Sequence, residues 1–253
     1  MTKLVWHPGP DSDADPATVG GKAANLARLS RIGQRVPPFF VATTAATRGG
    51  SRGGASGAQA QVDPAHHETL AGDPHVAVRS SAIGEDAAGE SFAGIHESFL
   101  YVKGAHAVWD AVQRVWHSAF AERAMSYRAS RGLPTGDIEI AVVVQRMIDA
   151  RVSGVVFTAD PATGDVHRVV VSSLFGLGEG LVSGGLEADL FTVDKRSGAI
   201  ERTIAAKQER FVLDAARGHG VTREMLPASL RAEPSLTDEQ VVGVLREARR
   251  IDE

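Results

Sequence analysis

The segment 78-VRSSAIGEDAAGESFAGIHESFL-100 has the residue types of a site that binds an anion. Backbone N–H groups approach an anion closely only where side chains are small, and a fixed cation offsets the negative charge. Arg79 ends a predicted strand, and residues 89–98 could expose successive amides, with the hydroxyl groups of Ser91 and Ser98 as further donors. Composition alone also fits a polar surface loop with a locally satisfied arginine, so both interpretations stay open at this point.

A second segment of the same kind is 20-GGKAAN-25, at the start of a predicted helix over residues 18–33. The amino end of a helix carries unpaired N–H groups and a partial positive charge, and both attract anions. Lys22 would add a full positive charge there. A lysine at a helix start is also often merely solvated, and the sequence does not separate the two roles.

Two familiar phosphate-binding motifs are absent from these segments. The Walker A pattern needs a glycine where Pro16 stands and a hydroxyl residue where Ala23 follows the lysine. The dinucleotide fingerprint G-x-G-x-x-G fails in 176-GLGEGLVSGG-185, because its third glycine comes too early or too late. The chain is therefore neither a P-loop protein nor, on this pattern, a Rossmann dehydrogenase.

Composition excludes several other classes of function. The chain has no cysteine, so disulfides, thiolate metal sites and a cysteine nucleophile are excluded. Its net charge is −4 and no basic stripe with interleaved aromatic residues occurs, so nucleic acid is not an expected partner. No run of 18 apolar residues and no signal peptide is recognisable, so we expect no membrane association and a cytoplasmic location.

Hydrophobic periodicity predicts a chain of alternating helices and strands. Residues 48–62 are rich in glycine, serine and alanine, which predicts a flexible linker that reaches to about residue 74. Residues 34–46 contain paired prolines and are expected to be extended. Helices are predicted over 18–33, 105–131 and 236–253, and strands over 75–81, 139–148, 153–160, 166–176, 189–195 and 199–207.

The order of the short motifs resembles a known family. The run includes 20-GGKAANLARL-29, 78-VRSSAIGED-86, 91-SFAGIHESFL-100, 142-VVVQRM-147, 153-SGVVFTADPATGD-165 and 175-FGLGEGLVSG-184. This succession resembles the nucleotide-binding domain of phosphoenolpyruvate synthase, which pyruvate phosphate dikinase and rifampicin phosphotransferase share. Each motif is weak alone, but seven or more in the same order are highly specific.

The resemblance implies an α+β fold of the ATP-grasp type, with mixed or antiparallel sheets flanked by helices. The expected lobes are residues 1–144 and 145–253, with ATP clamped between their sheets. In this family the domain passes the β-phosphate of ATP to a histidine on a separate swivelling domain, and AMP and phosphate are the other products.

The resemblance also assigns roles to individual residues. Lys22 and Arg79 match cations that hold the ATP phosphates and act in catalysis. Gln145 and Met147 fall on the strand that contacts adenine, where a strand edge would offer N–H and C=O groups to the purine. Met147 alone fits core packing equally well, and Glu179 could instead cap or orient its glycine turn. The full set of expected ATP-binding residues is Lys22, Arg79, Gly94, Ser98, Phe99, Gln145, Met147 and Glu179.

Several departures from the family leave the chain's own activity open. Ile95 stands where glutamine is common, and the region before Arg79 is short and glycine-rich. The sequence ends before the acidic segment that holds Mg²⁺ in the family, so the second lobe is expected to be incomplete and the Mg²⁺ ligands to lie outside this chain. One interpretation is the ATP-binding part of a phosphotransferase that works with a separate phosphohistidine chain or domain. The alternative is a non-catalytic nucleotide-binding or regulatory module.

Overall fold

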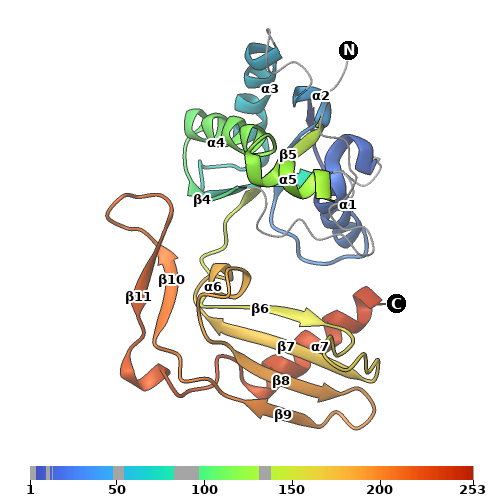
Figure 1. Cartoon of the computed structure of the whole chain (residues 1–253), viewed down its shortest axis with the longest axis vertical. Helices are drawn as coiled ribbons and strands as arrows, with labels where there is room; N and C mark the ends of the chain where they lie inside the picture. Colours follow the sequence, from blue (N-terminus) through green and yellow to red (C-terminus); the bar gives the residue numbers. More distant parts are fainter. Residues whose placement is uncertain are drawn as a thin grey trace. The chain divides into compact units, whose positions relative to one another are not determined.

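The structure is a computed structural model that describes residues 4–9, 12, 14–47, 54–82, 97–130 and 138–252. The chain forms two compact units, Met1–Ile148 with Ala215–Gly220, and Asp149–Asp214 with Val221–Glu253. Each unit combines antiparallel strands with helices, so the fold class is α+β (Figure 1). Within the described ranges, no helix is long and apolar enough to cross a bilayer.

A five-stranded antiparallel sheet forms the centre of the first unit. Its order is β1-β2-β5-β3-β4, so β5 lies in the middle. Its strands are β1 (Val5–Trp6), β2 (Phe39–Ala42), β3 (Val76–Ala82), β4 (Ser98–Val102) and β5 (Ile140–Arg146). Residues 140–144 of β5 are all buried, which explains why this strand is an uninterrupted apolar run.

Helices cover both faces of this sheet (Figure 1). On one face, α3 (Gly54–Thr69) and α4 (Ala105–Ser118) share an apolar cluster with the sheet. On the other face, α1 (Pro16–Arg31) packs through Val19, Ala23 and Ala27. The short helices α2 (Thr44–Thr47) and α5 (Glu122–Ser130) complete the described helices of this unit.

Two sequence predictions for this unit are wrong. The predicted linker contains helix α3, because Ala58, Val62 and Ala65 form a buried stripe at helical spacing that packs into the apolar cluster with α4. Residues 48–53 lie outside the described residues. The single helix predicted over 105–131 is two helices, α4 and α5, separated by a turn at residues 119–121. The prediction that residues 34–46 are extended is confirmed as far as the end of β2, but residues 44–46 belong to helix α2.

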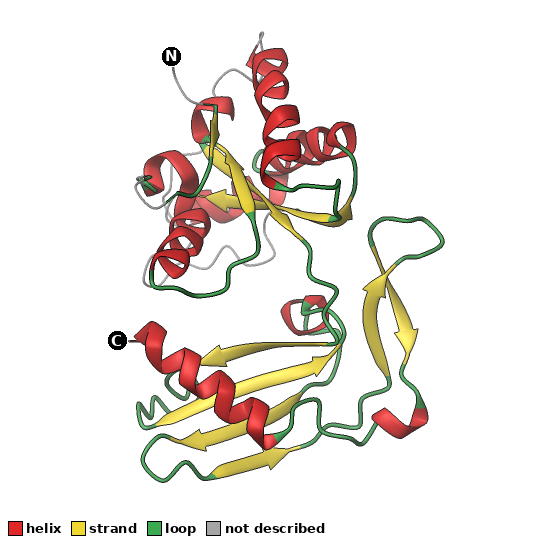
Figure 2. Ribbon diagram, turned by 180° about the vertical axis from the view of Figure 1, so that it is seen from behind, coloured by secondary structure: helices red, strands yellow, loops and turns green. Residues whose placement is uncertain are grey.

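A four-stranded antiparallel sheet forms the centre of the second unit, in the order β6-β7-β8-β9. The helix α7 (Asp238–Asp252) runs across one face of this sheet (Figure 2). Val241 and Leu245 of α7 pack against Val171 and Phe191 of the sheet. The strands are β6 (Val152–Phe157), β7 (Arg168–Phe175), β8 (Asp189–Asp194) and β9 (Ile200–Thr203), which confirms the predicted strands with shorter bounds.

Three smaller elements of the second unit were not predicted. The helix α6 (Glu179–Val182) follows β7, and the 3-10 helix η1 (Ala228–Leu230) precedes α7. The strands β10 (Glu209–Leu213) and β11 (Val221–Met225) form an antiparallel hairpin. Its residues are all at least partly exposed and mix charged with apolar side chains, so hydrophobic periodicity gave no clear signal for it.

A buried ion pair joins three segments of the second unit. Asp189 and Lys207 are 0% and 2% exposed, and Nζ of Lys207 lies 2.5 Å from Oδ1 of Asp189. The Asp189 carboxylate also accepts hydrogen bonds from the backbone N–H groups of Ala205 and Ser235, at 2.9 and 2.7 Å. The Asp189 carboxylate therefore has partners on both oxygens, and its bond to the Ser235 N–H holds the segment that leads into α7.

Candidate functional site

A sharp bend in α1 brings its glycines against β3. Gly20 has φ +77°, and a Cβ atom at this position would lie 1.9 Å from the carbonyl oxygen of Ser81. Only glycine permits this conformation and this close approach. A new helical run begins directly after the bend, and its Ala23 N–H donates to Oγ of Ser81 at 3.1 Å. The Gly-Gly-Lys segment therefore lies at a helix start pressed onto β3.

Lys22 and Arg79 are brought together by this contact. Nζ of Lys22 donates to the carbonyl oxygen of Ser80 at 2.8 Å, which places the ammonium group beside the residue that follows Arg79. Both cations are half-buried. Among the residues that the structure describes, no acid forms an ion pair with the Arg79 guanidinium. The Lys22 ammonium thus contacts the backbone of β3 directly after Arg79, and the Arg79 charge is not neutralised within the described chain.

Strand register extends this site across the sheet. Arg79 of β3 lies opposite Val143 of β5 and opposite Ser98 of β4. Directly opposed residues in an antiparallel sheet point to the same face, and Val143 belongs to the cluster packed on α1. Ser98 is exposed on this face, next to Arg79. A hydroxyl donor and a guanidinium therefore stand side by side on the face that carries Lys22.

Gln145 lies on the same face, because it opposes Ala77 of β3 and Phe39 of β2. Its Nε2 donates to the carbonyl oxygen of Pro37 at 3.2 Å. A carbonyl accepts only, so this contact turns the NH₂ group toward Pro37 and leaves Oε1 as an acceptor. The side chain is half-buried, so its amide has a fixed orientation at the end of β5.

Two backbone donors at the predicted adenine contact are paired within the chain. β5 is an interior strand, and the N–H of Arg146 donates to the carbonyl of Pro38 at 2.9 Å. The N–H of Met147 donates to the carbonyl of His75 at the same distance. These backbone donors are used by the sheet, so a purine at this end would have to be recognised by the Gln145 side chain or by groups further along the chain. Met147 itself is half-buried.

Phe99 does not join the cation site. It opposes Val78, whose side chain belongs to the cluster with α3 and α4 on the opposite face of the sheet. Its ring packs against that cluster, with the Arg114 guanidinium 4.1 Å from the ring centroid. Gly94 lies outside the described residues, as do Ser91 and Ile95.

Glu179 belongs to the second unit, at the start of α6. The glycine turn before it is held by backbone contacts: Leu177 N–H donates to the carbonyl of Phe211 at 3.0 Å, and Gly176 N–H donates to that of Arg151 at 2.8 Å. Gly176 has φ +83°, and a Cβ there would lie 2.6 Å from the Phe211 carbonyl oxygen. Among the described residues, no hydrogen bond of the Glu179 carboxylate shapes this turn.

One apolar surface of the second unit was not found by sequence reasoning. On the sheet face opposite α7, Val155, Phe157 and Leu190 are 39%, 43% and 39% exposed. Val155 and Leu190 both oppose Ser172, so they form one row across the sheet. Alternate residues of β6 and β8 face away from α7, and apolar residues occur among them as well as on the covered face. This pattern is the feature of the sequence that could have revealed the surface. Such a face can accept a flat apolar group.

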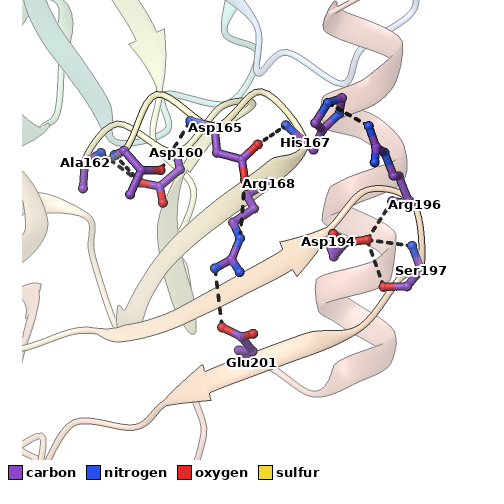
Figure 3. A network of polar contacts seen from close by, with 10 residues as sticks. Asp160, Ala162, Asp165, His167, Arg168, Asp194, Arg196, Ser197 and Glu201 are labelled. Atoms are coloured by element: carbon purple, nitrogen blue, oxygen red, sulfur yellow. Dashed lines mark hydrogen bonds and ion pairs between the residues drawn. The ribbon is translucent and has the colours of Figure 1, made fainter.

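Two carboxylates with a lowered pKa lie elsewhere in the second unit, in a network of two turns (Figure 3). Backbone N–H groups, chiefly that of Ala162, lower the pKa of Asp160, and the N–H and hydroxyl of Ser197 lower the pKa of Asp194. The turns are linked by a 3.0 Å contact between Arg196 and His167. These carboxylates are occupied in closing the β6–β7 and β8–β9 turns, so the network is structural.

The described residues also do not supply a metal site. Within the ranges that the structure covers, no three acidic, histidine or cysteine side chains come together as ligands for a metal ion. The Mg²⁺ expected from the sequence resemblance therefore has no ligand set in this part of the chain.

Comparisons with known proteins show which family the chain resembles. Residues 58–253 match the family described as pyruvate phosphate dikinase, AMP/ATP-binding domain. The chain is 37% identical to a rifampicin phosphotransferase of Streptomyces over 93% of its own length and 31% of the relative's. It is 38% identical to the prodigiosin synthesizing transferase PigC of Serratia marcescens, over 98% of the chain and 30% of the relative. It is 33% identical to a probable phosphoenolpyruvate synthase of Methanothermobacter thermautotrophicus, over 94% and 40%. The chain thus spans about a third of the length of these relatives.

Proposed function

Because the chain belongs to the family of pyruvate phosphate dikinase AMP/ATP-binding domains, we propose that it binds ATP through Lys22 and Arg79 for transfer of a phosphoryl group to a histidine on another domain or chain. The observation that supports this proposal is the contact of the Lys22 ammonium with the backbone of β3, beside Arg79. Nζ of Lys22 donates to the Ser80 carbonyl, and Arg79 directly precedes Ser80 in β3.

The chemistry of this face suits a polyphosphate. Phosphoryl transfer depends mainly on positioning the phosphates and offsetting their charge. Lys22 supplies a point charge, and Arg79 supplies a planar fork that can hold two oxygens of one phosphate. Ser98 adds a hydroxyl beside Arg79, and the helical run after Gly20 starts at the same place. Gly94, in the segment before β4, is proposed to add a backbone amide.

The proposed adenine contact lies at the carboxyl end of β5. Gln145 presents Oε1 as an acceptor, which suits the 6-amino group of adenine. Met147 would contribute a pliable apolar surface two residues later. Phe99 is proposed to act indirectly, since it packs on the opposite face of the sheet.

The second unit contributes to the proposal through its own features. Glu179 is half-buried, and the row of Val155 and Leu190 is a partly exposed apolar surface, which is proposed to contact a nucleotide base. The assignment of the two units as the two lobes of an ATP-grasp fold is part of this proposal. The described residues offer no ligand set for Mg²⁺, so no step of the proposal runs through a metal ion.

A titration series with nucleotides tests the phosphate site. If Lys22 and Arg79 hold phosphates, the affinity of the purified chain should rise from adenosine through AMP and ADP to ATP. Equal affinities for adenosine and ATP would contradict phosphate binding by these cations. Inorganic pyrophosphate should compete with ATP, because it can occupy the same cations without a base.

The transfer step needs a separate test. The chain is mixed with the remaining, histidine-bearing part of a relative, and release of AMP from ATP is followed by chromatography. AMP that forms only with both proteins present, and not with a Lys22→Ala chain, supports a role in transfer. ATP binding without any AMP release would instead support a nucleotide-binding or regulatory module.

A further inference from the structure

The start of β4 is held from the side of the sheet that faces away from the cations. The N–H of Glu97 donates to Oγ of Ser118 on α4, at 3.3 Å. Oγ of Ser118 in turn donates to the carbonyl of Val115 at 2.7 Å, so this hydroxyl is fixed within α4. Ser118 is only 8% exposed, so the hydroxyl that anchors Glu97 is held in a buried position.

A second anchor holds Phe99, one residue beyond Ser98. The Arg114 guanidinium stacks over the Phe99 ring, 4.1 Å from its centroid. The same side chain lies 3.9 Å from the Glu97 carboxylate, an exposed and long ion pair that contributes little by itself. Arg114 and Ser118 are one helical turn apart on α4, so both anchors act from a single rigid surface.

These anchors determine which way Ser98 points. Neighbouring residues in a strand face opposite sides of the sheet, so a strand that holds Phe99 against α4 must direct Ser98 to the other face. That face carries Arg79, which opposes Ser98 directly. A slip of one residue would exchange the two side chains, placing a phenylalanine beside the cation.

A local irregularity in the pairing of β4 with β3 lets residues at both ends of β4 pack toward α4. The register between β3 and β4 shifts between Val76 and Val78, and Tyr101 has φ +54°. This bulge allows Val102 as well as Phe99 to pack on the α4 side. Because the bulge breaks the alternation, the pairing beyond it does not by itself fix the orientation of Ser98. The contacts of Glu97 and Phe99 with α4 therefore help to fix the orientation of Ser98.

We propose that Arg114 and Ser118 are positioning residues for the nucleotide site on the opposite face of the sheet. They touch no ligand; they hold Glu97 and Phe99 so that Ser98 presents its hydroxyl beside Arg79. This inference rests on the proposed binding of ATP at Arg79. It assigns a role to a pair of α4 residues that no phosphate chemistry would have singled out.

A double-mutant cycle on ATP affinity tests this role. Arg114→Met retains an unbranched apolar side chain over Phe99 but removes the guanidinium, and it should weaken ATP binding about two- to fivefold, as expected for loss of an exposed cation–π contact. Ser98→Ala should weaken binding by at least as much. If Arg114 acts through Ser98, Arg114→Met should have no further effect on ATP affinity in a Ser98→Ala chain.

Matched variants separate positioning from general stability. Arg28→Met removes an exposed arginine from α1 and should leave ATP affinity unchanged. Ser118→Ala should behave like Arg114→Met, and Arg114→Lys should recover only part of the affinity because lysine does not stack as a plane. Thermal unfolding checks that each variant is folded. The change in melting temperature caused by Arg114→Met should be the same in the wild-type chain and in the Ser98→Ala chain.

Each outcome decides the matter. Equal losses of ATP affinity for Arg114→Met in the two backgrounds would overturn the inference, as would an unchanged affinity for Arg114→Met or for Ser98→Ala. These results would leave the proposed function standing if wild type binds ATP. Absence of ATP binding by the folded wild-type chain would overturn the proposed function, and the inference would fall with it.

Discussion

Two pairs of charged side chains in this molecule differ in the signs of their charges and in their burial. In the second unit, Asp189 and Lys207 are buried and every polar contact around them is made within the chain. In the first unit, Lys22 of α1 and Arg79 of β3 are half-buried and carry the same sign, and the Lys22 ammonium contacts the carbonyl of Ser80, which follows Arg79. Like charges placed together cost free energy unless a ligand offsets them. The Asp189–Lys207 pair is therefore structural, whereas Lys22 and Arg79 are suited to binding an anion.

The largest effect should come from breaking the satisfied pair. Lys207→Met leaves the Asp189 carboxylate buried without its counter-charge, and we expect the free energy of unfolding to fall by about 3–5 kcal/mol. Urea denaturation measures this change. The control Arg250→Ala removes an ion pair that is about half exposed, with Glu247, and should cost less than about 1 kcal/mol. Similar losses for both variants would show that the Asp189 pair is not the anchor described above.

The next largest effect should come from the bend that brings Lys22 to β3. Gly20→Ala forces a side chain into a positive-φ position against Ser81, so stability should fall by about 1–3 kcal/mol and ATP binding should weaken as Lys22 moves. The control is Gly243→Ala in α7, where an added Cβ meets nothing within 4 Å. That change should stabilise the chain by about 0.5–1 kcal/mol. A Gly20→Ala chain with wild-type stability and affinity would contradict the close packing of α1 on β3.

A smaller effect is expected at the base contact. Gln145→Leu removes the proposed acceptor for the 6-amino group and should weaken ATP binding about two- to tenfold, the range for one hydrogen bond. Inosine triphosphate, which carries an oxygen at that position, should bind the wild type less tightly than ATP. Gln208→Leu is the matched control, since that amide also donates to a backbone carbonyl but is exposed in the second unit. Unchanged selectivity in the Gln145→Leu chain would remove this residue from the site.

The smallest effect is expected at His66, a buried side chain that belongs neither to the Asp189–Lys207 pair nor to the proposed ATP site. His66 is 0% exposed, and burial lowers its pKa below the ordinary value of 6.5, although the nearby Asp73 carboxylate opposes this shift. The unfolded chain therefore takes up a proton at this residue before the folded chain does. Stability should fall as the pH drops below about 6.5. Urea denaturation at pH 7.5 and 5.5 measures this, and His66→Gln should flatten the dependence. His106→Gln, at a side chain that is 85% exposed, should leave it unchanged.

Much of the fold could be predicted because its strands are apolar runs bounded by turns. β5, β7 and β8 were found from residues such as Val143, Val171 and Phe191, whose burial dictates their type. α3 was missed because its buried face uses small residues, Ala58 and Ala65, inside a composition that resembles a linker. The hairpin β10–β11 was missed because its strands mix charged and apolar residues and none of them is buried.

The site could be predicted only in part for a different reason. Lys22 and Arg79 could be named from their motifs, but their proximity depends on the bend at Gly20 and on the packing of α1 onto β3. The orientation of Phe99 away from the cations depends on the pairing of β4 with β3 and on its bulge, neither of which leaves a pattern in the sequence. Residue types thus indicated the chemistry, and long-range register determined which of them could meet.

The most direct test of the anion site is a calorimetric titration of ATP into the wild-type chain and its Arg79→Ala, Lys22→Ala and Arg28→Ala variants. We predict that the first two variants lose affinity tenfold or more, about 1.4 kcal/mol, while Arg28→Ala binds as the wild type does. Folded Arg79→Ala and Lys22→Ala chains that bind ATP as tightly as the wild type would contradict the assignment of these cations, and with it the distinction between the two charged pairs.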